Sequence, residues 1–162
     1  MAELTQLEAK IAEVIGLAQA AQGATDKVSR LVEDGDVKQT LERMGQEAAE
    51  TEERTTQVAD HLDGKKTAIL EKARETKQEA TEMMSTYLGS DADGLDGLEF
   101  LTMAEAGEVG HWQILGTMNR RAGNRELQEV IEWVTPIQER HFQQTLQGSL
   151  KLAAKDDPNE PA

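Results

Sequence analysis

The chain has 162 residues, of which 38% are hydrophobic, and 31 acidic residues against 17 basic ones give it a formal net charge of −14. This length suffices for the core of one domain and argues against two. The acidic excess and the absence of a lysine or arginine cluster argue against nucleic acid or an anionic membrane surface as a partner. No apolar run approaches the ~20 residues that cross a bilayer, so we expect a soluble protein.

Cysteine is absent from the chain. Disulfides, thiolate zinc sites and iron–sulfur clusters are therefore excluded, and any metal would have to be held by carboxylate and imidazole groups. Residues 1–7 show no basic stretch followed by an apolar one, as a secretory signal or a transit peptide would. We therefore expect the protein to be cytoplasmic.

Two long helices are predicted in the first part of the chain. Apolar or small residues recur at alternating intervals of three and four from Leu4 to Val32, and again from Val37 to Leu62. This spacing is typical of helices that bury one face. Between them lies Asp34-Gly35-Asp36, where Gly35 could form a left-handed cap and Asp36 could begin the next helix. So short a turn predicts an antiparallel pair.

A weaker stripe from Ile69 to Tyr87 predicts a shorter helix in the connection, between about residues 65 and 88. The residues at the centre of this stripe are small or polar. The segment 89–97 holds three glycines and three aspartates and is expected to be a loop. Its spacing does not match a calcium-binding EF-hand loop, which requires glycine at its sixth position and glutamate at its twelfth.

The last two helices are predicted over 101–122 and 127–152, with a stop at Gly123-Asn124 and with Pro136 expected to kink the second of them. Residues 155–162 have nothing to bury and are expected to form a disordered acidic tail. The sequence therefore predicts a single all-α domain over residues 1–154. We expect an antiparallel four-helix bundle with a short extra helix in its central connection.

Two polar pairs interrupt the apolar stripes of the last two helices. Glu108 and His111 are three residues apart on one helix, and Gln138 and His141 are three apart on the next. Each pair lies on its own helix's stripe and is expected to point inward. In a hairpin about residues 123–124 the pairs stand at similar distances from the turn, so we expect the four side chains to share one buried layer.

A layer of carboxylates and imidazoles can hold iron, manganese or zinc. Glu8 and Glu47 flank the apolar stripes of the first two helices and could complete the ligand set, and Glu105 and Glu139 stand beside the two pairs. A buried layer of this kind can equally be a hydrogen-bonded structural feature that holds no metal. Both interpretations stay open at this point.

Four short stretches carry a resemblance to a known family. They are Glu50-Thr51-Glu52-Glu53-Arg54, Gly64-Lys65-Lys66, Gly110-His111-Trp112-Gln113 and Gln138-Glu139-Arg140. In the same order, they resemble four segments of the ferritin-like stress-response family of bacterial proteins typified by YciE and YciF. These segments are its Glu-Thr-Glu-x-His stretch, its connecting segment, its Glu-His-Tyr-Glu stretch and its Glu-Glu-Lys stretch. The resemblance covers roughly residues 4–152 and implies a ferritin-like four-helix bundle.

The metal-ligand set implied by this resemblance is degenerate in the present chain. Arg54 replaces the family's histidine, and Gly110 and Gln113 replace two of its glutamates. Three of the positions that the resemblance implies as ligands still hold a suitable residue: Glu50, His111 and Glu139. The helical spacing places Glu50 toward the outside of its helix and therefore favours Glu47 as the inward carboxylate.

The function implied by the resemblance is that of a stress-associated protein of unsettled activity with an altered carboxylate–histidine site. The alternative is a helical interaction protein without metal that pairs with itself or with a partner helix. No nucleophile–base pair or phosphate-binding loop supports a hydrolase or a transferase. Trp112 and Trp133 are expected to pack in the core or between subunits, and we expect a homodimer.

Overall fold

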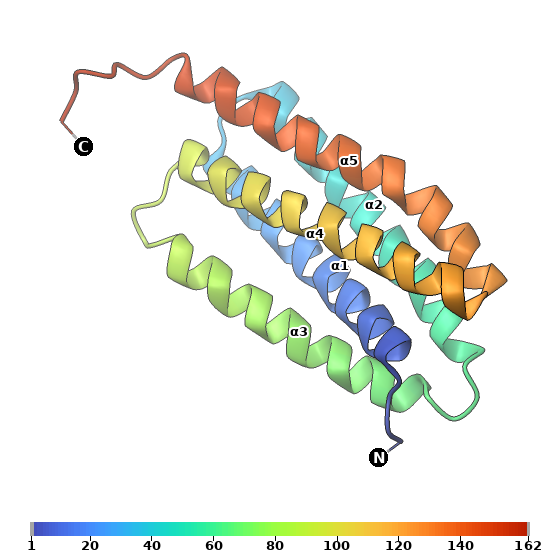
Figure 1. Ribbon diagram of the computed structural model, residues 1–162. Helices are drawn as coiled ribbons and strands as arrows, with labels where there is room; N and C mark the ends of the chain where they lie inside the picture. The colour runs from blue at the N-terminus through green and yellow to red at the C-terminus, as the bar shows by residue number, and fades with distance from the viewer. Residues whose placement is uncertain (1, 162) are drawn as a thin grey trace.

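The computed structural model describes residues 2–161 and is all-helical, with no strand in that range (Figure 1). None of these helices combines the length and the apolar character that a membrane crossing requires. The helices follow in chain order: α1 (Gln6–Leu31), α2 (Gly35–Asp60), α3 (Lys66–Tyr87), α4 (Gly94–Ala122) and α5 (Arg125–Ala153). They lie close to the predicted ranges except at the start of α4, which begins seven residues early, so that the loop expected over 89–97 is limited to residues 88–93.

The helix ends follow local capping chemistry. Thr5 and Glu8 form a reciprocal capping box at the start of α1, which satisfies backbone N–H groups that the first turn leaves free. Gly123, with φ 71°, ends α4 in the left-handed conformation. The N-cap expected for the second helix was wrong by two residues. Asp34, not Asp36, accepts the N–H groups that begin α2, and Gly35 is already helical.

Asp34 also joins two helix ends that are distant in sequence. The Lys151 ammonium at the end of α5 lies 2.7 Å from the Asp34 carboxylate, and the Lys155 ammonium lies 3.5 Å from it. The hydrogen bond from Lys151, followed by that from the Val37 N–H, lowers the pKa of Asp34 to about 2. The carboxylate therefore stays charged and holds the start of α2 beside the end of α5.

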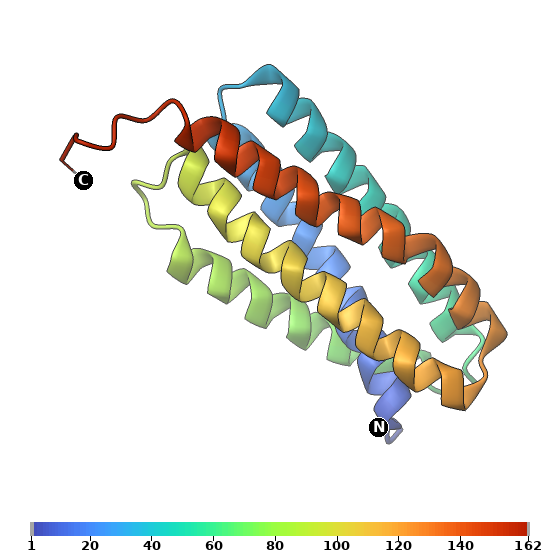
Figure 2. The same ribbon diagram turned by 45° about the horizontal axis from the view of Figure 1, so that its top comes forward.

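The helices pack in alternating directions (Figures 1 and 2). The pairs α1–α2, α4–α5, α1–α4 and α2–α5 are in contact, so these four helices enclose a common core. In both views α3 returns the chain along the length of the molecule and lies outside this group, beside α1 and running in the same direction. This return path allows α4 to start at the same end as α2.

Close backbone approach fixes the first half of α3 on α1. A Cβ atom on Gly16 would clash with the carbonyl oxygen of Ala73 and would lie 2.7 Å from Cβ of Thr76, so only glycine fits there. Ile69 and Ala73 are buried at this contact, whereas Met83 and Tyr87 near the end of α3 are exposed. The first half of α3 is therefore fixed on α1, whereas its end contacts α4 through the rings of Tyr87 and Phe100, whose centroids are 5.6 Å apart.

The core consists of two apolar clusters with polar side chains between them. One cluster is centred on Ile15, Ile69 and Trp112, and the other on Val28 and Leu41. The buried polar residues of the middle are Thr51, Thr55, Glu105, Glu108, Gln138, His141 and Thr145. Such groups are costly to bury unless hydrogen bonds satisfy them. The middle of the bundle is therefore the candidate functional region.

The C-terminal part agrees with the sequence in outline. α5 continues through Pro136 without a break, and residues 154–161 lie outside any helix and are exposed. The disorder expected for 155–162 stays a prediction, and Ala162, like Met1, lies outside the described residues. The expected homodimer also stays a prediction. Its best candidate surface holds the exposed side chains of Tyr87, Met103 and Leu150, which line one shallow depression.

Candidate functional site

Five side chains from three helices meet in the middle of the bundle, and we call them the central polar layer. Glu47 comes from α2, Glu105 and Glu108 from α4, and Gln138 and His141 from α5. All but Glu47 are buried, with at most 7% of their surface exposed. The layer therefore carries an acidic group on two of the four core helices.

His141 lies between two carboxylates. Its Nε2 is 2.5 Å from a Glu47 oxygen, and its Nδ1 is 3.7 Å from a Glu105 oxygen. The Arg140 guanidinium lies 2.5 Å from the other oxygen of Glu47. Burial raises the pKa of Glu47, but the hydrogen bonds from His141 and Arg140 outweigh it, so the net pKa is lowered. Glu47 is thus held as an anion at the edge of the layer.

The two carboxyls of α4 differ in their partners. The Gln138 amide donates a hydrogen bond to a Glu105 oxygen. Within residues 2–161 the Glu108 carboxyl takes part in no hydrogen bond or ion pair, although the residue is only 7% exposed. Burial, and then the negative charge of Glu105, raise the pKa of Glu108 well above its ordinary value. The Glu108 carboxyl therefore favours its neutral, protonated form.

The expected layer of Glu108, His111, Gln138 and His141 was wrong in one member. The inward face of α4 carries Glu105, Glu108 and Trp112, whereas His111 is half-buried and faces α1, with Nδ1 3.5 Å from a Glu13 oxygen. The two groups do not have the geometry of a hydrogen bond, so the buried Nδ1 of His111 has no hydrogen-bond partner among the described residues. Glu105, and not His111, therefore contacts Gln138 and His141, while the neighbouring Trp112 is 1% exposed in the core.

The remaining ligand candidates do not reach the layer. Glu8 belongs to the capping box at the start of α1, and Glu139 is exposed on α5. Glu50 is also exposed and pairs with Arg54, so the spacing argument for Glu47 as the inward residue of α2 is confirmed. Arg54 lies over the Trp133 ring at 4.2 Å.

A metal-binding cluster does not emerge from this arrangement. In the part of the chain that the structure describes, no group of three or more histidine or acidic side chains could hold a metal ion. The geometry shows the reason, because both ring nitrogens of His141 face carboxylates on opposite sides and do not converge with them on one point. Metal binding therefore stays a prediction from the sequence.

No family model, curated protein or solved structure matches this chain. Conclusions about function must accordingly come from the central polar layer and from the cavities that border it.

One cavity borders the central polar layer directly. It has a volume of about 230 Å³ and lies between α1, α3 and the first half of α4. Its walls are mostly apolar or small, its ionisable groups are all on α4, and Thr81 adds one hydroxyl from α3. The α4 groups are Glu105, Glu108 and His111, and the other walls include Leu17, Ala20, Ala21, Ala24, Ala80, Met83, Met84, Phe100 and Met103. We call this space the α1–α3–α4 cavity.

The α1–α3–α4 cavity could not be foreseen from local sequence. It exists because α3 is fixed to α1 at Gly16 and makes few contacts with α4 farther along. The alanines of α1 and Ala80 of α3 leave the intervening space unfilled. The one sequence signal was the small and polar centre of the third stripe, which weakens the apolar pattern there.

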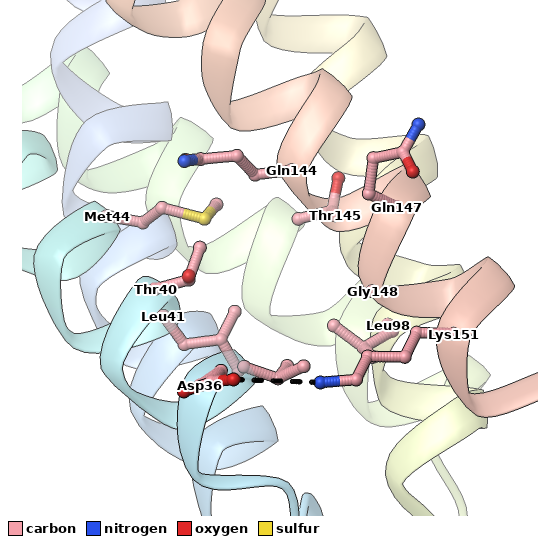
Figure 3. A pocket seen from close by; sticks show the side chains of 11 residues that line it. Asp36, Thr40, Leu41, Met44, Leu98, Gln144, Thr145, Gln147, Gly148 and Lys151 are labelled. Carbon is pink, nitrogen blue, oxygen red and sulfur yellow. Dashed lines mark ion pairs between the residues drawn. The ribbon is translucent and has the colours of Figure 1, made fainter.

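A second cavity, of about 320 Å³, lies between α2 and α5 (Figure 3). Thr40, Met44 and Gln144 surround it, and the ion pair between Asp36 and Lys151, 4.0 Å long, lies at one end. The Asp36 side chain is 95% exposed. This cavity is therefore a hydrated surface pocket with mixed polar walls, and it offers less apolar shelter than the α1–α3–α4 cavity.

Proposed function

We propose that the protein is a ferritin-like helical bundle that binds a small apolar ligand in the α1–α3–α4 cavity. The single observation that carries this proposal is an apolar cavity lined by the buried Glu108 carboxyl, which has no partner among residues 2–161. Ligand sites in proteins are typically concave and apolar, with a few polar groups that orient the ligand. A cavity of about 150 Å³ can hold benzene, so the measured volume is sufficient for a somewhat larger molecule.

The ferritin-like part of the proposal is supported by the chain path. Ferritin-like bundles join two antiparallel helix pairs by one long connection that spans the bundle. Here α1–α2 and α4–α5 are such pairs, and α3 fills the connection. The sequence resemblance supports the same assignment and extends it to a stress-associated role.

The state of the central polar layer favours ligand binding over metal chemistry. His141 bonds to Glu47, and Gln138 bonds to Glu105, so most of the layer is satisfied by the protein itself. A metal at His141 would have to displace one of these contacts. Within the central polar layer, Glu108 is the one member without a partner among residues 2–161, and it faces the cavity and not a set of converging ligands.

Calorimetric titration with 1-octanol, a neutral amphipathic probe, tests the proposal. We expect saturable binding that Ala80→Leu weakens by at least about tenfold, or 1.4 kcal/mol, because the new side chain fills the cavity from the α3 side. Ala49→Leu makes the same substitution at an exposed position of α2 and should leave binding unchanged. Failure of the unaltered protein to bind, or equal binding by both variants, would reject the cavity as the site.

A further inference from the structure

The charged groups of the α1–α3–α4 cavity all lie on one wall. Glu105 and Glu108 stand one helical turn apart on α4, and His111 follows Glu108 by another turn. The residues that line the α1 and α3 walls include neither lysine nor arginine. An anionic ligand head would therefore meet two carboxyls and no fixed cation, which is unfavourable in an apolar site.

The Glu108 carboxyl is the polar group best placed to contact a ligand. It is 93% removed from solvent by the surrounding protein, lines the cavity and has no partner among the described residues. The neighbouring Glu105 is already engaged by Gln138 and faces His141. An unpaired buried carboxyl is costly, so a donor supplied by a ligand would gain more here than at a satisfied group.

We propose that the ligand of the α1–α3–α4 cavity is an amphipathic amine, whose ammonium group binds Glu108 and whose apolar chain lies between α1 and α3. This inference rests on the proposed function and specifies the chemistry of its ligand. An ammonium group brings three donors and a positive charge, so it favours the ionised form of Glu108, to which it can then bond, and it also attracts Glu105. The net charge of −14 favours the approach of a cation over that of an anion.

The remaining walls suit an apolar chain of variable shape. Met83, Met84 and Met103 surround the outer part of the cavity, and methionine adapts its flexible thioether to irregular ligands. Alanines at positions 20, 21 and 24 leave a smooth channel along α1. These flexible side chains restrict the chain length of the amine less than the carboxyls of α4 restrict its head group.

Three probes of equal chain length test the inference by isothermal titration calorimetry at neutral pH: octylammonium chloride, 1-octanol and sodium octanoate. We expect octylammonium to bind at least about tenfold more tightly than octanol, as charge-assisted hydrogen bonds are stronger than neutral ones. Octanoate should bind most weakly. In Glu108→Gln the preference for octylammonium over octanol should disappear, while octanol binding persists.

Glu99→Gln supplies the matched control, because it removes the same charge from an exposed position of α4. It should keep the preference for octylammonium. Equal binding of octylammonium and octanol would leave the cavity proposal standing and overturn the amine inference, whereas binding of none of the probes would overturn both. Displacement of octylammonium by ammonium chloride at equal concentration would show a general cation site and would also overturn the inference.

Discussion

At the scale of single residues, Glu108 is a buried carboxyl whose surroundings disfavour its charged form. Burial and the charge of Glu105 raise its pKa, so the folded protein binds a proton there that the unfolded chain releases at lower pH. Stability must therefore fall as pH rises above about 4.5, the ordinary glutamate value, because the folded state holds more protons. Glu47 acts in the opposite sense, since its lowered pKa favours folding above that pH.

Replacing Glu108 by glutamine should remove the penalty of burying a charge. We expect Glu108→Gln to be more stable than the parent at pH 8, by on the order of 1–3 kcal/mol, and the gain to shrink toward zero at pH 4. Urea unfolding at a series of pH values measures the difference. Glu99→Gln, on the exposed face of α4, should stay within about 0.5 kcal/mol of the parent throughout. A Glu108→Gln variant less stable than the parent at pH 8 would contradict the argument.

At the scale of helices, the contact of α1 with α3 decides whether the cavity can exist. Gly16 allows the two backbones to approach, and farther along α1 the alanines face an α3 that is no longer in close contact. Glycine within a helix carries an entropic penalty relative to alanine, so its presence at this position reflects the approach of a neighbour. The second glycine of α1, Gly23, has no atom near enough to obstruct a Cβ.

The two glycines of α1 therefore make a matched pair of substitutions. Gly16→Ala should destabilise the protein by about 1–3 kcal/mol, as added atoms in a close-packed contact do. Gly23→Ala should stabilise it by about 0.5–1 kcal/mol through helix propensity. Thermal and urea unfolding measure both. Equal effects of the two substitutions would mean that α3 is not seated on α1 as described.

At the scale of the whole molecule, the question is whether any metal stabilises the fold. A ligand that binds only the folded state raises its stability by mass action, by about 2.7 kcal/mol at a hundredfold excess over its Kd. The described residues offer no cluster of three metal-ligating side chains, and His141 is engaged on both sides. We therefore expect the melting temperature to stay unchanged when Fe²⁺, Mn²⁺ or Zn²⁺ is added to chelator-treated protein.

The variant His141→Ala is the control for this metal measurement. Without a metal site it should melt at a lower temperature than the parent, since Glu47 and Glu105 lose a partner, and it should respond to the ions as the parent does. A rise in the parent's melting temperature with one ion, absent from the variant, would restore the metal site predicted from the sequence.

The sequence by itself determined the helices and much of the polar layer. Capping residues such as Thr5 and the left-handed Gly123 act on their own helix ends, so their effect is local and legible. The three-four spacing also showed that Glu108, Gln138 and His141 are buried, and that Glu47 points inward where Glu50 does not. These properties depend on one helix at a time.

Tertiary structure decided which side chains of the central polar layer pair with one another and where the α1–α3–α4 cavity forms. Adjacent residues of a helix differ in direction by about 100°, so Ala104 and Glu105 fit the same stripe almost equally well until Trp112 is packed. Packing against the other helices chose Glu105 and turned His111 toward α1. The α1–α3–α4 cavity likewise depends on the angle between helices, because α3 meets α1 at Gly16 and leaves α4 farther along, which no spacing within a single helix encodes.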